Sequence, residues 1–181
     1  MQAADLSRDF FALFDLPVSF DVDLNTLAER YRKAQREVHP DKFANASEAE
    51  RRLSMQLAAR INEAHRVLKD PLARGRYLLE LRGIALDDMD TAFDGAFLMQ
   101  QMELRERLAE VNASADPHQQ LQVIAREISA HSQALIAEMA ALLQTEDRDD
   151  WQQAREATRK LQFFRRLREE ADALDDELNE F

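Results

Sequence analysis

The sequence predicts an all-α protein, built as a helical hairpin unit followed by a three-helix bundle. Composition is the first reason: the 181 residues include only three glycines and four prolines, which leaves little material for the tight turns of a sandwich or barrel. The most frequent residues, Ala, Leu, Glu, Arg and Gln, are strong helix formers. Apolar residues also recur at three- and four-residue steps, as they do along one face of a helix.

Four helices are expected in the first half of the chain, and capping residues mark where three of them begin. Asp23 is a good N-cap. Ser47 and Glu50 have the spacing of a capping box, and Asp70-Pro71 places an N-cap before a proline at the first helical position. The expected helices are Leu6–Phe14, Leu24–Val38, 47–69 with its cap, and Leu72–Leu81.

The second half is expected to begin with a linker and to continue in three longer helices. Asp116-Pro117 marks the start of the middle helix. The loops between these helices are short, so neighbouring helices should be antiparallel. The expected helices lie near 91–112, 117–144 and 148–180. We therefore divide the chain into residues 1–80, a linker at 81–90 and a bundle at 91–181.

Charge and cysteine content exclude several classes of function. The chain has no cysteine, which excludes disulfides, zinc–thiolate sites and cysteine nucleophiles. Its net charge is −11, but residues 1–80 carry 13 basic and 13 acidic residues, whereas residues 81–181 carry 11 and 22. No large region is net basic, which disfavours nucleic-acid binding. The N-terminal segment is mixed and acidic and no stretch is long enough to span a membrane, so a cytoplasmic protein is expected.

The tripeptide His39-Pro40-Asp41 lies between two expected helices and permits several interpretations. His39 and Asp41 could act as an acid–base pair, but the neighbouring sequence offers neither a nucleophile nor a second acid. They could hold a metal ion, but two ligands are fewer than such sites use. From the tripeptide alone, a rigid recognition element and a plain surface turn both remain open.

The surroundings of this tripeptide resemble a known family. The segment Tyr31–Phe43 resembles helix II and the following loop of the J-domain family. Downstream, Ile61–Pro71, followed by Arg74 and Tyr77, resembles the end of helix III and helix IV of the same family. The resemblance covers most of the first eighty residues and implies an N-terminal J domain, a helical hairpin with a His-Pro-Asp loop.

J domains are co-chaperones of DnaK-type heat-shock ATPases, so the resemblance implies a surface that triggers ATP hydrolysis by such a partner. Arg32 and Arg36 are four residues apart and Lys33 lies beside them, which places the three cations on one helix face. An ordinary solvated face is the alternative. Glu37 and Val38 stand where the family often has a basic residue and Tyr, which favours a specialised chaperone. The implied contacts are His39, Pro40, Asp41, Arg32, Lys33, Arg36 and Lys42.

The segment 96–108 has two apolar faces, although a helix of a bundle needs only one. The first stripe consists of Phe97, Leu104, Leu108 and Val111, and the second of Leu98, Met99 and Met102, bordered by Glu103 and Glu106. The second stripe either packs within the chain or meets the other half, an oligomer or a client; methionine suits adaptable binding surfaces. In the last helix Phe163 points off the core stripe, and it either joins this patch or flanks a wide core.

A second resemblance covers the acidic half. Residues 91–110 and the run Arg159–Phe163 resemble the C-terminal domain of the HscB family, which are dedicated J-type co-chaperones of iron–sulfur cluster assembly. In that family this domain binds the scaffold protein IscU and presents it to the chaperone HscA. The resemblance implies scaffold contacts, which we expect to form one exposed apolar patch with an acidic rim, at Leu98, Met99, Met102, Glu103, Glu106 and Phe163.

The sequence therefore predicts an adaptor co-chaperone without a catalytic site, cofactor or metal of its own. The expected partners are an HscA/DnaK-type ATPase and an IscU-type scaffold, and neither nucleic acid nor membrane. Three alternatives remain: a J-domain co-chaperone for a different client, a basic-helix nucleic-acid-binding protein, and a small hydrolase that uses His39 and Asp41. The client bound by the C-terminal half, salt-dependent affinity for nucleic acid and turnover by the isolated protein would discriminate among them.

Overall fold

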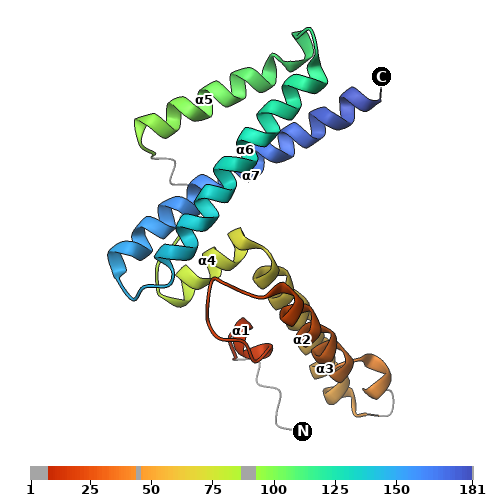
Figure 1. The fold of residues 1–181 in the computed structure, drawn as a ribbon. Coiled ribbons are helices and arrows are strands. Elements are labelled where there is room, and N and C mark those ends of the chain that lie inside the picture. The colour runs from red at the N-terminus through yellow and green to blue at the C-terminus, as the bar shows by residue number, and fades with distance from the viewer. Residues whose placement is uncertain (1–7, 44–45, 87–92, 181) are drawn as a thin grey trace. The chain divides into compact units, whose positions relative to one another are not determined.

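The structure is a computed structural model that describes residues 8–43, 46–86 and 93–180 (Figure 1). Every regular element within these ranges is helical, so the all-α prediction is confirmed. Two short 3-10 turns, Pro40–Phe43 and Val111–Ala113, accompany the α-helices. The α-helices are α1 (Phe10–Leu13), α2 (Leu24–Glu37), α3 (Glu48–Lys69), α4 (Pro71–Leu81), α5 (Gly95–Ala109), α6 (Pro117–Leu142) and α7 (Arg148–Asn179).

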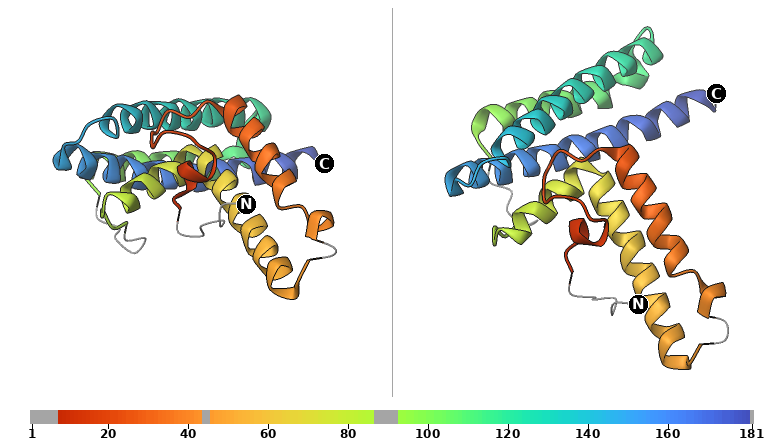
Figure 2. Two further views of the ribbon diagram at one scale, coloured as in Figure 1. Left: turned by 90° about the horizontal axis from the view of Figure 1, so that it is seen from below. Right: turned by 60° about the horizontal axis from the view of Figure 1, so that its bottom comes forward.

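The chain divides into two compact units, Met1–Arg82 and Gly83–Phe181. The first contains α1 to α4 and the second contains α5 to α7 (Figure 2). The expected linker at 81–90 includes residues 87–90, which lie outside the described ranges, as do the first residues of the helices expected at 6–14 and 91–112.

Side-chain caps determine where three helices of the first unit, α2, α3 and α4, begin, as the sequence predicted. The Asp23 carboxylate accepts two backbone N–H groups of the first turn of α2, at 2.8 and 2.9 Å. The Ser47 amide donates to the Glu50 carboxylate at 2.9 Å, and the Glu50 amide donates to the Ser47 hydroxyl at 3.3 Å, which completes a capping box. Asp70 accepts an amide of the first turn of α4 at 2.7 Å.

Two helices begin later than the apolar pattern predicted, and in both an aspartate cap is the reason. The Asp9 carboxylate accepts the amide of Ala12 at 2.9 Å, so α1 is a single turn. The Asp94 carboxylate accepts the amide of Phe97 at 2.8 Å, and α5 follows directly from it. An N-cap residue has extended backbone angles, so the helix cannot continue upstream of it.

The first unit is a hairpin of α2 and α3 whose core is completed by α1 and α4. An aromatic contact joins the two arms, because the Tyr31 ring stacks on the His65 ring with centroids 3.9 Å apart. The Tyr77 hydroxyl accepts the amide of Phe10 at 2.9 Å and thereby attaches α1 to α4. The fully buried side chains of this core include Phe11, Phe14, Leu27, Leu68, Leu78 and Leu79.

The second unit is a three-helix bundle. The connected helices α6 and α7 run antiparallel as a long pair, and α5 lies along them (Figures 1 and 2). The first predicted stripe of α5 faces the core as expected. The core cluster that α5 joins contains Phe97, Leu104, Leu108, Val111, Leu121, Ile124, Ile128, Phe163, Phe164, Leu167 and Ala171. None of the helices described has the length and apolar character needed to cross a membrane.

Candidate functional site

The His-Pro-Asp tripeptide forms an exposed turn directly after α2. Pro40 opens the 3-10 turn, and the Lys42 amide closes it by donating to the His39 carbonyl at 3.0 Å. The Asp41 amide donates to Nδ1 of His39 at 3.3 Å, and the Asp41 carboxylate lies 3.3 Å from the same nitrogen. The side chains of His39 and Asp41 are 58% and 89% exposed. His39 and Asp41 therefore present polar side chains to solvent that contact each other.

This arrangement does not support the hydrolase interpretation. General acid–base catalysis on a bound substrate requires further catalytic groups in a pocket that excludes water. His39 and Asp41 instead contact each other on an open surface. Among the described residues, no group of three or more His, Cys, Asp or Glu is placed to hold a metal ion.

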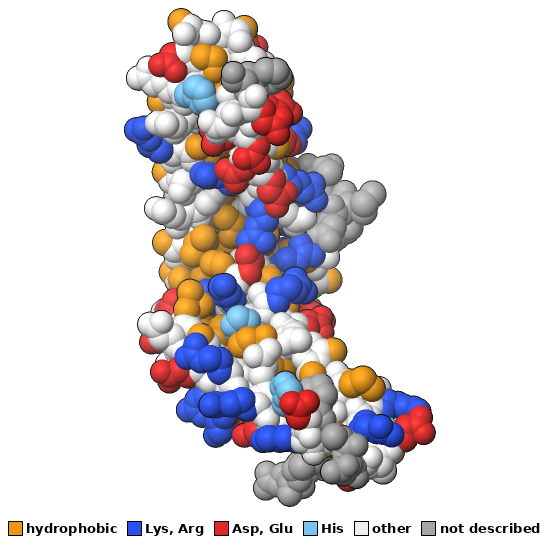
Figure 3. Space-filling view, turned by 90° about the vertical axis from the view of Figure 1, so that its right-hand side faces the viewer, with side chains coloured by type: hydrophobic (Ala, Val, Ile, Leu, Met, Phe, Trp, Pro, Cys, Tyr) orange, Lys and Arg blue, Asp and Glu red, His pale blue; other side chains and the backbone are white. Residues whose placement is uncertain are grey.

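A groove of about 580 Å³ adjoins the turn, between α2 and α3. It brings together two of the predicted cations and the histidine of the tripeptide, since its lining residues are Arg32, Gln35, Arg36, Val38, His39, Ala58 and Asn62. Lys33 and Lys42 are exposed nearby. Lys and Arg side chains gather on the face of the first unit in Figure 3, beside a histidine and an acidic side chain. None of Arg32, Lys33 and Arg36 forms an ion pair with another described residue, so the cations are available to a partner.

A polar and aromatic network holds this face of α2 against α3. The Tyr31 hydroxyl donates to the side-chain amide oxygen of Asn62 at 3.0 Å, and the Gln35 side-chain amide donates to the same hydroxyl at 2.5 Å. Partial burial, reinforced by the charge of Lys69, lowers the pKa of His65, which favours the neutral ring that stacks on Tyr31. The cations of α2 therefore lie on a helix that these contacts hold against α3.

The second stripe of α5 is exposed, as predicted. Leu98, Met99 and Met102 are 42%, 70% and 68% exposed. Glu103 and Glu106, which border them in the sequence, are also exposed. We call these five residues the α5 patch. Exposed apolar clusters with a polar border mark protein–protein contact sites.

The prediction that Phe163 joins this patch as an exposed residue is wrong. Phe163 is 9% exposed and belongs to the core of the bundle. Its ring meets Phe97 of α5 at 5.6 Å in an edge-to-face contact, while the next ring, Phe164, stacks on His131 of α6 at 5.2 Å. Because α7 packs against two helices, consecutive residues are both buried, and Phe163 flanks a wide core.

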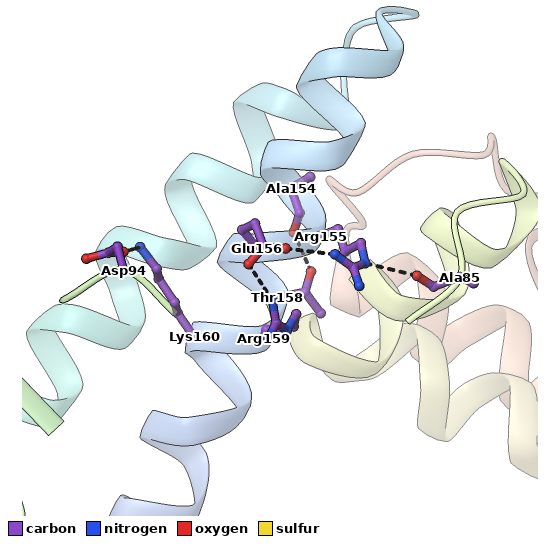
Figure 4. Close-up of polar contacts among 8 residues, drawn as sticks. All are labelled: Ala85, Asp94, Ala154, Arg155, Glu156, Thr158, Arg159 and Lys160. Atoms are coloured by element: carbon purple, nitrogen blue, oxygen red, sulfur yellow. Dashed lines mark hydrogen bonds and ion pairs between the residues drawn. The ribbon is translucent and has the colours of Figure 1, made fainter. Parts of the chain in front are cut away.

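A polar cluster on α7, which the sequence pattern did not predict, fixes the start of α5 (Figure 4). Lys160 donates to the Asp94 carboxylate at 2.9 Å, and this hydrogen bond, with that of the Phe97 amide, lowers the pKa of Asp94. The Arg159 guanidinium lies 4.5 Å from the centroid of the Phe93 ring. Glu156, which accepts hydrogen bonds from Arg155 and Arg159, orders the cluster. The i, i+3 spacing of Glu156 and Arg159 is a weak signal for it.

Comparison with known protein families finds two matches. Residues 12–77 match the DnaJ domain, and residues 93–172 match the family described as the HSCB C-terminal oligomerisation domain. The two matches occupy the two structural units separately.

Individual relatives cover nearly the whole chain. The co-chaperone protein HscB homolog of Shewanella halifaxensis is 44% identical over 94% of this chain and 98% of its own length. The co-chaperone protein HscB homolog of Pseudoalteromonas atlantica is 41% identical over 96% of this chain and 99% of its own length. Among solved structures, the chaperone HscB from Vibrio cholerae superposes with a TM-score of 0.85 at 39% identity, covering 94% of this chain and 99% of that one. The human co-chaperone protein HscB superposes with a TM-score of 0.87 at 33% identity, covering 97% of this chain and 86% of that one.

Proposed function

Since the chain belongs to the HscB family of J-domain co-chaperones, we propose that it delivers an iron–sulfur scaffold protein of the IscU type to a chaperone ATPase of the HscA or DnaK type. In this function the protein has no catalytic site of its own and works in the cytoplasm. The observation that carries the proposal is that one chain presents two different exposed surfaces on two separate units. These are a cationic face with a His-Pro-Asp turn and an apolar patch with an acidic rim.

The chaperone contact is the surface formed by the turn and the cations of α2. His39 and Asp41 brace each other, so the turn loses little conformational freedom when it binds. Arg32, Lys33 and Arg36 attract an acidic partner from a distance and speed its association. Pro40 and Lys42 complete the contact. The exposed side chains then act on the ATPase and raise its rate of hydrolysis, while the bond-breaking groups belong to the partner.

The scaffold contact is the α5 patch together with Phe163 of α7. Leu98, Met99 and Met102 supply apolar surface that is removed from water on binding, and flexible methionines adapt to the partner. Glu103 and Glu106 complement a basic border on the scaffold. The two contacts use different residues on different units, so the partners do not compete for the same side chains. A chain that holds both raises the local concentration of one near the other.

The test is a single-turnover ATPase assay with an HscA-type chaperone, with and without an IscU-type scaffold. The wild-type chain should stimulate hydrolysis alone and more strongly with scaffold. His39→Gln should reduce both effects about thirtyfold. Met99→Ala combined with Met102→Ala should keep the first and lose the second, because it alters only the α5 patch. Stimulation by scaffold that survives the double substitution would exclude the α5 patch as the scaffold contact.

A matched control uses Val123, another exposed apolar residue of the second unit, on α6. Val123→Ala removes exposed apolar surface from the same bundle and should leave both levels of stimulation unchanged.

A further inference from the structure

Arg105 of α5 covers Phe163, a contact that the proposed function leaves unexplained. Its guanidinium lies 5.4 Å from the centroid of the Phe163 ring. The other ring neighbours, Phe97 and Phe164, meet Phe163 edge to face from inside the bundle, at 5.6 and 5.5 Å. A residue expected to meet the scaffold is therefore buried on one side by its own core and on another by a charged surface side chain.

Arg105 lies on the exposed side of α5, in line with the patch. Leu98, Met102 and Arg105 follow one another at steps of four and three residues, so their side chains form one row along the helix. Leu104, next to Arg105 in the sequence, is 1% exposed and faces the core. The Arg105 side chain is 57% exposed, so it closes the end of the apolar row and is not part of the bundle interior.

The contacts that hold Arg105 over the ring are weak. Its ion pair with Glu170 of α7 spans 3.9 Å, and both side chains are more than half exposed. By contrast, Arg107 on the other side of α5 pairs with Glu127 of α6 at 2.7 Å, with side chains 30% and 37% exposed. Exposed ion pairs and exposed cation–π contacts each contribute little to stability. The long side chain can thus leave the ring while the helices stay in place.

The charge of Arg105 also opposes the proposed partner. Glu103 and Glu106 on the same helix favour a basic border on the scaffold. Arg105 carries the same sign of charge as that border, and the approach of the border pushes the guanidinium away from the patch.

We propose that Arg105 is a displaceable lid: it covers Phe163 in the free protein and swings off the ring when the scaffold docks. An apolar scaffold side chain then takes the place of the guanidinium and extends the contact from Leu98 and Met102 to the Phe163 ring. Arg105 acts through Phe163 and is a positioning residue. This inference rests on the proposed function, and it explains how a buried residue can belong to an interaction surface.

The test combines two measurements on the full chain. Calorimetric titration with an IscU-type scaffold compares wild type, Arg105→Ala, Phe163→Leu and the double variant. Arg107→Ala is the matched control, since it removes an arginine of α5 that pairs across the bundle away from Phe163. Second, the relaxation of the Phe163 ring protons by a soluble paramagnetic agent is measured by NMR in the free proteins, which reports whether the ring is covered.

A lid predicts that Arg105→Ala raises scaffold affinity about three- to tenfold, since the covering contacts no longer have to be broken. The gain should vanish in the Phe163→Leu background, ring relaxation should rise in Arg105→Ala, and Arg107→Ala should change neither. A gain that persists without the Phe163 ring would reflect charge repulsion alone and would overturn the lid. A loss of affinity, or unchanged ring relaxation, would overturn it as well. Absence of scaffold binding by the wild type would instead overturn the proposed function, and the lid with it.

Discussion

The two candidate surfaces differ in what lies beneath them. Around the His-Pro-Asp turn, the proposed contact residues His39, Asp41 and Lys42 and the cations of α2 are polar and exposed, so folding and recognition use different side chains there. On the second unit the proposed residues are divided: Met99 and Met102 are exposed, whereas Phe163 is one of the core residues of the bundle. Mutation should therefore separate function from stability completely in the first unit and only in part in the second.

The largest expected effect is on the stability of the second unit. Phe163→Ala should lower the free energy of unfolding by about 3–5 kcal/mol, because it leaves a cavity among the core rings. Leu98→Ala should change it by about 0.5 kcal/mol or less, because Leu98 is exposed. Urea unfolding followed by the fluorescence of Trp151, the single tryptophan of the chain, reports on this unit. Equal losses for the two variants would contradict the division within the second surface.

The next largest effect is expected in the first unit, where a substitution should reduce function and leave stability unchanged. His39→Gln should reduce ATPase stimulation by about thirtyfold, since central contact residues contribute about 2 kcal/mol or more to binding. Its melting temperature should stay within a degree or two of wild type, because the side chain is largely exposed. His118→Gln, at an exposed histidine of the second unit, is the matched control and should alter neither quantity. A large drop in melting temperature for His39→Gln would make the histidine structural.

The same contrast explains how far the sequence alone could predict this protein. Helix starts at Asp23, Ser47 and Asp70 depend on residues within four positions of each other, so local patterns predicted them. The period of a single helix placed Met99 and Met102 off the core stripe of α5, and the structure shows both side chains exposed.

The burial of Phe163 could not be predicted from a local pattern. Its burial reflects the arrival of α5 against α7, and no periodicity within α7 can reveal that a second partner helix widens the buried face. The hydrogen bond between Asp94 and Lys160 joins residues 66 positions apart for the same reason. Contacts between distant segments were therefore the part that the sequence could not supply.

A smaller effect is expected from the charges beside the turn. Reversing Arg32, Lys33 and Arg36 to Glu should slow association with the ATPase about tenfold and leave dissociation nearly unchanged, because exposed charges act mainly through steering. The effect should shrink as salt is raised. Reversal of Arg165, Arg166 and Arg168, which are exposed on α7, makes the same change in net charge and should not slow association. Stopped-flow binding at several salt concentrations measures the association rate of each triple variant and its salt dependence. Equal slowing by the two triple variants would indicate an effect of net charge.

The smallest expected effect compares how acid weakens the two units. In the first, hydrogen bonds from the Ser47 hydroxyl and amide lower the pKa of Glu50 below its ordinary value of 4.5. In the second, hydrogen bonds from Lys160 and the Phe97 amide lower the pKa of Asp94 below 3.8. A carboxyl group with a lowered pKa in the folded state stabilises the fold at pH above its ordinary pKa, and the contribution is lost as the pH falls through the lowered value.

Glu50→Gln and Asp94→Asn should therefore each melt below wild type at neutral pH, and the differences should shrink on acidification to about pH 3. Each difference in melting should appear only in the unit that carries the substitution. The two units can be followed separately because both tyrosines of the chain lie in the first unit and the tryptophan lies in the second. Near-ultraviolet circular dichroism separates these signals during melting. A difference that stays constant with pH would mean that the substitution acts through packing, because an uncharged contribution does not titrate. Loss of both signals together in either variant would show that the two units unfold as one.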